Sequence, residues 1–163
     1  MNAQEINTIA KELVERHNEG KSFKNQKEGA GWNQGAWVGI GYELNVDVTD
    51  INKIVKRVVK IAHPDVKLSA RKDHGGYHHA ITVEILECDT HIRECKYTEQ
   101  DKADNQPPHA REYTEKGRAV TDLIVNVLAY FNKYNCDSMT DHFEVGFYSS
   151  VTHTSNLEKE IIV

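Results

Sequence analysis

The feature that most constrains the fold is a helical pattern with one apolar and one basic side, from Asp50 to Ile61. Isoleucine and valine recur every three or four residues, the spacing of one buried helix face: Ile51, Ile54, Val55, Val58 and Ile61. Four cations recur with the same spacing on the other side: Lys53, Lys56, Arg57 and Lys60. The sequence therefore predicts a helix that buries one side and exposes a row of positive charge.

The residues after this helix predict two strands. His63-Pro64-Asp65 ends the helix, because proline lacks an amide donor and disfavours the α conformation of the preceding residue. Residues 66–71 alternate with period two, Gly75-Gly76 supplies a turn, and residues 77–87 alternate again. We expect residues 50–87 to form a helix and a β-hairpin.

Two further helices follow from the same periodicity. Residues 2–18 place apolar side chains on one face, and Gly20 is typical of the position after a helix end. Residues 118–134 carry the broadest apolar stripe in the chain. We expect the helix at 118–134 to lie with the helix at 51–61 on one face of a sheet.

The other segments predict short strands and polar connections. Strands are expected at 37–42 and 143–151, and residues 88–97 continue as strand or turn. The tail that ends in Ile161-Ile162-Val163 is either an edge strand or frayed. Residues 21–35 and 98–117 are polar, and we expect exposed loops there.

This order predicts an α+β fold with a mixed or antiparallel sheet of three to five strands. Two main helices pack on one face, and an extra helix precedes them. At 163 residues, one domain spanning 1–163 is the default. Residues 1–45 supply the N-terminal helix and a Trp-bearing loop, and residues 50–150 supply a core α-β-β-α-β unit.

The composition favours a soluble protein of the cytoplasm. Apolar residues make up 39% and charged residues 28% of the chain, as in globular proteins. No apolar run approaches the ~18 residues of a membrane span, and the first residues lack the pattern of a signal peptide. Three cysteines in such a chain are expected to be free thiols.

The net charge of −5 conceals an asymmetry along the chain. Residues 51–72 carry seven Lys or Arg against one acid, whereas residues 73–163 carry eight against sixteen. A basic segment in an acidic chain can meet phosphate groups or be covered by the chain's own carboxylates. The candidate basic patch consists of Lys53, Lys56, Arg57, Lys60, Lys67 and Arg71.

Histidine, cysteine and aspartate are frequent enough to raise the question of a metal or a catalytic site. The densest potential ligand cluster comprises His74, His78, His79, Cys88, His91 and Cys95. Zinc needs four converging donors, but positions 88 and 91 of a strand face opposite sides. Near the end of the last predicted helix, Asp137 and Asp141 are expected to shape a turn. We therefore assign no metal, cofactor or catalytic residue.

One part of the sequence resembles a known family. The run His63-Pro64-Asp65-Val66-Lys67-Leu68-Ser69-Ala70-Arg71, followed by Ala80-Ile81-Thr82-Val83 and later by Phe131 to Asp141, is similar to the large polyvalent protein associated domain of type twenty-nine. The resemblance spans residues 50–145, but Ser138 stands where the family has glycine. It implies an origin in a phage, plasmid or other mobile element and implies no catalytic residues.

The first functional expectation is a non-enzymatic protein that binds and inhibits a host protein. Given the mobile-element resemblance, the target is a nucleic-acid-handling defence complex in the bacterial cytoplasm, such as a CRISPR effector or another nuclease. Carboxylates of the acidic segment would occupy a basic groove of that target. The candidate acidic residues are Asp89, Glu94, Glu99, Asp101, Asp104, Glu112 and Glu115.

Two alternatives stay open beside this expectation. The basic patch could bind nucleic acid directly, and a metal protein or an enzyme of unknown reaction comes third. Trp32 and Trp37 form either an exposed aromatic binding patch or a lid over the core. An exposed edge strand at the tail would favour a homodimer, so the oligomeric state is open as well.

Overall fold

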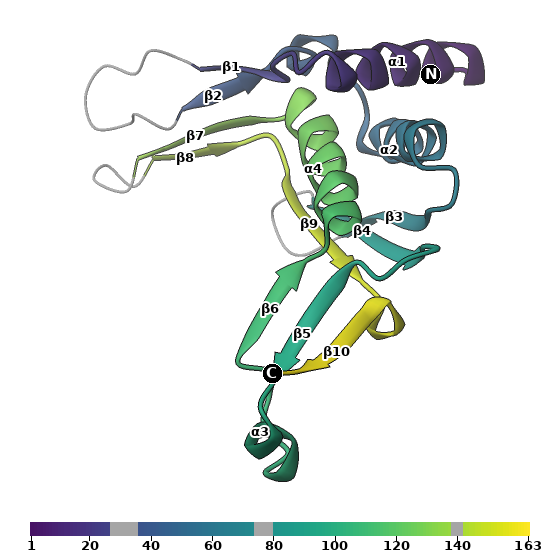
Figure 1. Ribbon diagram of the computed structural model, residues 1–163. Helices are drawn as coiled ribbons and strands as arrows, with labels where there is room; N and C mark the ends of the chain where they lie inside the picture. Colours follow the sequence, from purple (N-terminus) through teal and green to yellow (C-terminus); the bar gives the residue numbers. More distant parts are fainter. Residues whose placement is uncertain (27–35, 74–79, 138–141) are drawn as a thin grey trace.

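The computed structural model describes residues 1–26, 36–73, 80–137 and 142–163 and shows an α+β fold (Figure 1). Within these ranges, four α-helices accompany three small sheets of three or four strands. The predicted α+β class is therefore confirmed. The prediction of a single sheet is wrong, because the strands are short and divide among three sheets.

The helices of the described ranges are α1 (Ala3–Asn18), α2 (Val48–Ala62), α3 (Glu99–Ala103) and α4 (Glu115–Tyr130). Each of the three long helices begins after a side chain that accepts hydrogen bonds from first-turn amides. These capping residues are Asn2, Asp47 and Thr114. Of the helices described here, none has the length and apolarity needed to cross a membrane.

The four-stranded sheet is antiparallel and has the order β1 (Lys24–Gln26), β2 (Trp37–Gly39), β7 (Lys133–Asp137) and β8 (His142–Val145). Its two hairpins extend to one side of α4 (Figure 1). β2 and β7 are therefore the central strands of this sheet.

The central sheet has the order β3 (Lys67–Asp73), β4 (Ala80–Glu87) and β9 (Tyr148–His153), with β4 and β9 parallel. The distal sheet, at the end of the molecule away from α1, combines β10 (Glu158–Ile162), β5 (Arg93–Tyr97) and β6 (Ala110–Tyr113) (Figure 1). β10 runs parallel to β5 and forms one edge of this sheet. The predicted edge strand of the tail is thus present.

The core lies between α1, α2, α4 and the central sheet. The largest side chains with almost no exposure come mainly from α2, α4 and β4: Ile51, Ile54, Val55, Ile81, Ile85, Leu123, Ile124 and Leu128. α2 packs on α1, β3 and α4, and α4 also contacts β9. The expectation that the two main helices pack together is confirmed.

One buried amide fixes the junction between two sheets. Asn132 Nδ2 donates to the carbonyl oxygen of Phe147 at 2.8 Å, and Asn132 Oδ1 accepts from the backbone nitrogens of Phe147 (3.0 Å) and Lys133 (2.8 Å). This side chain holds the point where α4 ends and β7 begins against the point where β8 gives way to β9. A buried amide satisfied in this way fixes a single chain geometry.

This junction explains why one predicted helix is too long and one predicted strand is two strands. The helix predicted at 118–134 ends at Tyr130, because Lys133 and Tyr134 already belong to β7. The single strand predicted at 143–151 is two strands, because the chain changes sheets at Gly146 and Phe147. Neither apolar pattern encodes these changes, because they depend on hydrogen bonds between Asn132 and Phe147, 15 residues apart in sequence.

Three further segments differ from the predictions. The loop predicted at 98–117 contains α3 and β6, and β6 pairs with β5 although its sequence is polar. The loop predicted at 21–35 contains β1 up to Gln26, beyond which its residues lie outside the described ranges. The strand predicted at 37–42 ends at Gly39. The predicted helices at 2–18 and 50–61 are confirmed, and Gly20 has a φ of +64° as expected after a helix end.

The start of α4 provides a test of the packing. Gly117 is buried, and a Cβ atom there would lie 2.0 Å from the carbonyl oxygen of Ile92. We expect Gly117→Ala to lower the free energy of unfolding by about 2 kcal/mol, because backbone atoms would have to move apart. Alanine ordinarily stabilises a helix by up to ~1 kcal/mol relative to glycine.

Urea unfolding followed by circular dichroism would measure the change, with Ala119→Gly as the control for helix propensity in the same helix. A Gly117→Ala protein as stable as the wild type would show that α4 does not start against Ile92.

Candidate functional site

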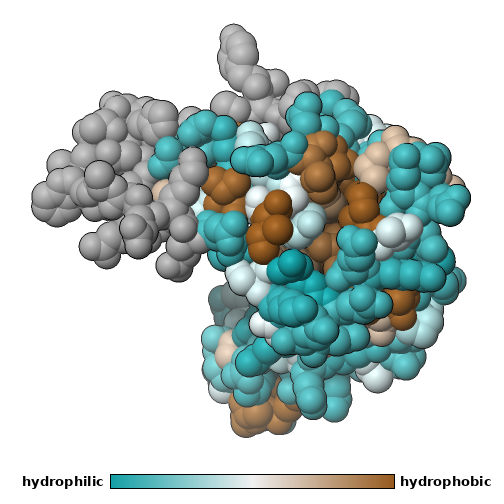
Figure 2. Space-filling view, turned by 90° about the horizontal axis from the view of Figure 1, so that it is seen from above, coloured by the Kyte–Doolittle hydropathy of each residue, from teal (hydrophilic) through white to brown (hydrophobic). Residues whose placement is uncertain are grey.

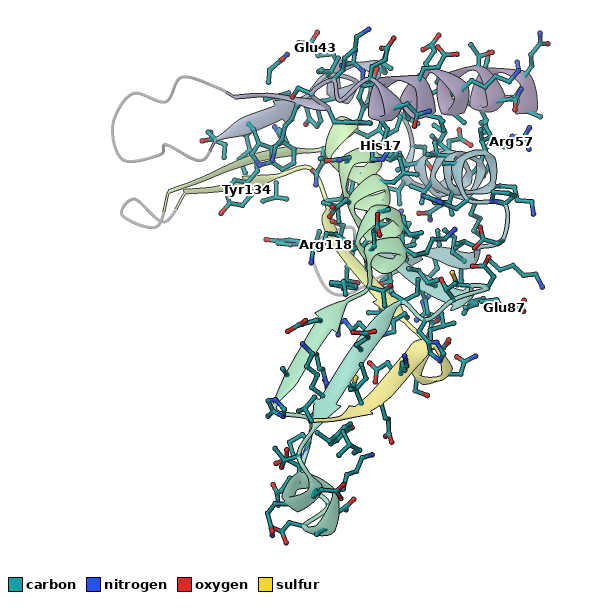
Figure 3. All side chains as sticks on the ribbon, in the orientation of Figure 1. His17, Glu43, Arg57, Glu87, Arg118 and Tyr134 are labelled. Atoms are coloured by element: carbon teal, nitrogen blue, oxygen red, sulfur yellow. The ribbon has the colours of Figure 1, made fainter. Side chains whose placement is uncertain are left out.

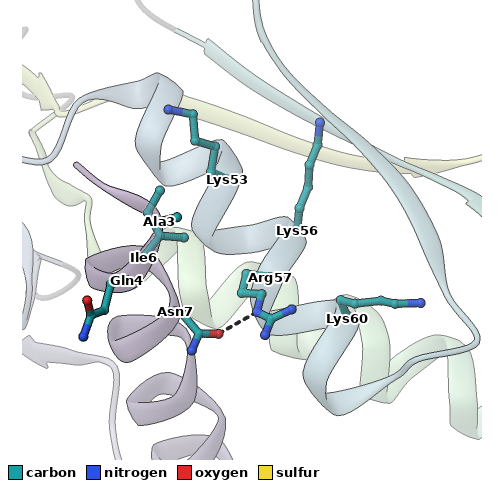
Figure 4. A pocket seen from close by; sticks show the side chains of 8 residues that line it. All are labelled: Ala3, Gln4, Ile6, Asn7, Lys53, Lys56, Arg57 and Lys60. Atoms are coloured by element: carbon teal, nitrogen blue, oxygen red, sulfur yellow. Dashed lines mark hydrogen bonds between the residues drawn. The ribbon is translucent and has the colours of Figure 1, made fainter.

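A groove with a volume of about 730 Å³ lies between α1 and α2 (Figure 4). α1 contributes small, apolar and amide side chains to it, and α2 contributes four cations. The lining residues are Ala3, Gln4, Ile6, Asn7, Lys53, Lys56, Arg57 and Lys60. We call this feature the α1–α2 groove.

The two helices present these residues because each buries its other face. On α1, Ala10 and Leu13 are fully buried, and the side chain of Asn2 caps the first turn by accepting from the amides of Gln4 and Glu5. On α2, Ile54 and Val58 have no exposed surface. With those apolar faces fixed in the core, the three-to-four spacing turns the four cations toward solvent beside α1.

Three of the four cations have a local partner. Arg57 Nε donates to Asn7 Oδ1 at 2.8 Å across the groove, Lys53 Nζ to Asp50 Oδ1 at 2.7 Å, and Lys60 Nζ to the carbonyl oxygen of Pro64 at 3.0 Å. Within the described part of the chain, Lys56 has no hydrogen bond or ion pair. Lys53 and, through its terminal amino group, Met1 hold the pKa of Asp50 below its usual range.

The predicted basic patch is therefore divided by the structure. Its four helical members line the groove, whereas Lys67 and Arg71 lie on β3. Lys67 Nζ pairs with Glu87 Oε2 of the neighbouring strand at 2.5 Å. Sequence spacing identified the groove cations, and it missed Gln4, Ile6 and Asn7, because contact between α1 and α2 is not encoded in either helix alone.

A second hollow of about 400 Å³ lies on another side of α1. It is lined by Met1, Glu5, Ile9, Leu44, Asn45, Val46, Asp47 and Asp50. Apolar residues gather between hydrophilic ones on the face seen from above in Figure 2. The three carboxylates that line this second hollow already have partners. Glu5 and Asp47 accept hydrogen bonds from backbone amides at the starts of α1 and α2, and Asp50 pairs with Lys53.

Most of the predicted acidic residues gather around the distal sheet. Glu94 lies on β5, Glu112 on β6, and Glu99 and Asp101 on α3, with Asp104 at its end. Asp89 lies between β4 and β5, and Glu115 is the first residue of α4.

Basic side chains are interleaved with this acidic group. Lys96 Nζ lies 2.8 Å from Glu112 Oε2, His109 Nδ1 lies 3.6 Å from Asp101 Oδ2, and Lys102 pairs with Glu160. The pKa of Glu112 is lowered by Lys96, and that of Asp101 by its hydrogen bonds with Thr98. The acidic group is therefore partly neutralised by the chain itself.

Of the predicted cysteine and histidine cluster, the two described cysteines have different partners. Cys88 Sγ lies 3.5 Å from Asp65 Oδ2, whereas the buried Cys95 Sγ lies 3.3 Å from Glu158 Oε2. Burial raises the pKa of both thiols, so both are protonated at neutral pH. His74, His78 and His79, as well as Asp141 and Trp32, lie outside the described residues.

Asp65, Cys88 and Asp89 form the one group of metal-ligand type among the described residues, with ligand atoms within 4.8 Å of one another. The Nζ atom of Lys116 lies 2.9 Å from Asp65 Oδ1, so an ammonium group already neutralises this carboxylate. Lys116 holds the pKa of Asp65 well below its usual range. The group works as an ion pair that joins the end of α2 to the start of α4.

Of the two predicted tryptophans, the structure describes Trp37. Trp37 lies on β2 outside the main core, where its ring stacks with that of Tyr134 on β7. Trp37 therefore does not cover the core that the described residues form. Tyr134 was missed because the sequence placed it at the end of a helix.

Comparisons with known proteins give no relatives: no family model, no curated protein and no solved structure matches this chain. The resemblance to the large polyvalent protein associated domain stays a prediction.

The Asp65–Lys116 pair predicts a pH-dependent stability. A carboxylate whose pKa is lowered in the folded state stabilises the fold above its unfolded pKa of ~3.9, and this contribution is lost as the pH falls. We expect Asp65→Asn to cost about 1 kcal/mol of unfolding free energy at pH 7. This cost should shrink steadily as the pH falls below ~4 toward the lowered folded-state pKa of Asp65.

Urea unfolding at several pH values would measure this cost. The matched control is Asp73→Asn, at an exposed position of β3. A cost that is the same at all pH values would mean that packing, and not the ion pair, holds Asp65.

Proposed function

We propose that this protein acts by binding a partner protein, and that the α1–α2 groove receives an acidic amphipathic helix of that partner. The observation that carries the proposal is the combination of four cations with an apolar floor in one groove. Among its eight described lining residues there is no carboxylate, imidazole or thiol. Such a lining suits recognition of an apolar and acidic surface better than general acid–base catalysis.

The spacing of the cations matches a helical occupant. Lys53 and Lys60 are seven residues apart, which is about 10.5 Å along α2 at 1.5 Å per residue. A helix lying alongside α2 has the same rise, so carboxylates placed three and four residues apart would meet successive cations. Its apolar side chains would rest on Ala3, Ile6 and the aliphatic stems of the lysines.

The local partners of the cations leave room for new contacts. Arg57 uses Nε to bond Asn7, so its two terminal nitrogens remain for a bidentate carboxylate. Lys53 and Lys60 each keep further ammonium protons, and Lys56 extends from the middle of the row (Figure 4). A partner therefore gains charge-assisted hydrogen bonds without breaking those present.

Nucleic acid is the less suitable occupant of this groove. An apolar floor contributes nothing to phosphate binding, whose strength comes from charge. Outside the basic segment the chain is acidic, with a net charge of −5 overall, and a long polyanion would meet that repulsion. A short helix with one acidic face would touch the groove alone.

The groove predicts a charge-reversal effect on peptide binding. Fluorescence anisotropy would measure the affinity of the protein for a labelled helical peptide that carries leucine on one face and glutamate on the adjoining face. We expect the double substitution Lys56→Glu and Arg57→Glu to weaken binding by about tenfold or more, because attraction at two contacts becomes repulsion.

The matched control is Lys67→Glu with Arg71→Glu, which makes the same change of charge on β3, outside the groove. This control should bind like the wild type, and a peptide with lysine in place of glutamate should not bind. Equal losses in both double variants, or stronger binding to a DNA duplex than to the peptide, would overturn the proposal.

A second candidate function concerns the distal sheet. The placement of α3 at the far end of the molecule favours it, because Glu99 and Asp104 are exposed there (Figure 1). In this proposal the protein inhibits a nucleic-acid-handling defence complex of a bacterial host, and these carboxylates enter a basic groove of the target.

Inhibition of a purified CRISPR nuclease by excess protein would test this second candidate, with Glu99→Lys and Asp104→Lys expected to abolish inhibition. Lys56→Glu with Arg57→Glu should leave inhibition intact, because those residues lie on α2. An uninhibited nuclease counts against this candidate and leaves the groove proposal standing.

A further inference from the structure

The four-stranded sheet presents a pair of aromatic rings on its two central strands. Trp37 of β2 and Tyr134 of β7 are direct partners in the antiparallel register. Their ring centroids are 6.3 Å apart, and their planes differ by 16°. Cross-strand partners lie on the same face of a sheet, so the two rings form one aromatic surface.

This aromatic surface is accessible and lies beside a cation. Tyr134 is 41% exposed, and Trp37 is half-buried. Lys24 Nζ lies 4.9 Å from the centroid of the Trp37 ring. Figure 3 shows Tyr134 on this sheet, remote from Arg57 between α1 and α2. The surface is thus separate from the α1–α2 groove.

The strand register places acid on the opposite face. Glu144 pairs with Lys133, next to Tyr134 in β7, and side chains that are neighbours in a strand point to opposite faces. The side chains that the structure describes at positions shared with the rings are those of Lys24, Trp37, Tyr134 and Val145. One of these is a cation, and none is an acid.

We propose that this face of the four-stranded sheet stacks the bases of single-stranded nucleic acid. The exposed Tyr134 ring, stacked against Trp37 on its inner side, offers its outer face to a base, and this kind of stacking tolerates any sequence. The Lys24 ammonium lies where it can meet a backbone phosphate. Strand addition by a peptide is disfavoured, because it needs a sheet edge, whereas these rings are on central strands.

Anisotropy of a labelled ten-nucleotide oligothymidine, titrated with the full chain at low salt, would test the proposal. Tyr134→Ala should weaken binding about tenfold by removing one stacking surface, while Tyr134→Phe should stay within about twofold. Lys24→Gln should weaken binding severalfold and flatten its salt dependence. Lys159→Gln removes the same charge from the exposed surface of β10, in a different sheet, and should leave oligothymidine binding unchanged.

Lys24 is exposed, so the Lys24→Gln variant still tests the proposal if Tyr134→Ala fails to fold. The proposal is overturned by no binding at ~100 μM protein, or by binding that Lys159→Gln weakens as much as Lys24→Gln does. Displacement of the oligonucleotide by a proline-rich peptide, but not by unlabelled oligothymidine, would also overturn it. None of these outcomes bears on peptide binding in the groove.

Discussion

The burial of one face of α2 is the constraint on which the rest of the structure depends. Ile51, Ile54, Val55, Val58 and Val59 have almost no exposed surface, and they contact α1, β3 and α4 at once. At roughly 1.5–3 kcal/mol for each buried aliphatic side chain, this face outweighs the surface interactions of the helix. Because the apolar face is fixed in the core, the cations on the other side of α2 point toward solvent beside α1.

The three small sheets follow from the way the chain leaves this core. α4 packs against α2, but its two ends join different sheets: Thr114 bonds to the backbone of His91 and Ile92 before β5, and Asn132 bonds to Phe147 before β9. One helix thus fixes the four-stranded sheet at one end and the distal sheet at the other. The two parallel pairings, β4 with β9 and β5 with β10, connect the last part of the chain to earlier strands.

Local periodicity predicted the elements whose pattern is set by one buried face. The helices at 2–18 and 50–61 and the strands on either side of residue 75 are present because their apolar spacing matches their burial. The same reasoning failed at β6, a polar strand that exists because it pairs with β5, and at β7, which the apolar end of α4 concealed. Both errors come from hydrogen bonds between segments distant in sequence.

In the candidate sites too, local spacing predicted some residues, whereas others come together only through packing between distant segments. The row of Lys53, Lys56, Arg57 and Lys60 could be predicted, because helix geometry alone places these side chains on one face. Their setting could not, because Asn7 and Ile6 join them only when α1 packs on α2. The Trp37–Tyr134 surface depends on the register of β2 with β7, which no local pattern in either strand encodes.

We propose that the fixed α2 face makes the α1–α2 groove the binding surface for an acidic helix. Amide chemical shifts of the labelled protein, followed during titration with the glutamate-bearing helical peptide, test it most directly. We expect the shifts to concentrate at residues 3–7 and 53–60, with little change in α3, β6 and β7. Shifts centred on the distal sheet, or none at millimolar peptide, would contradict it.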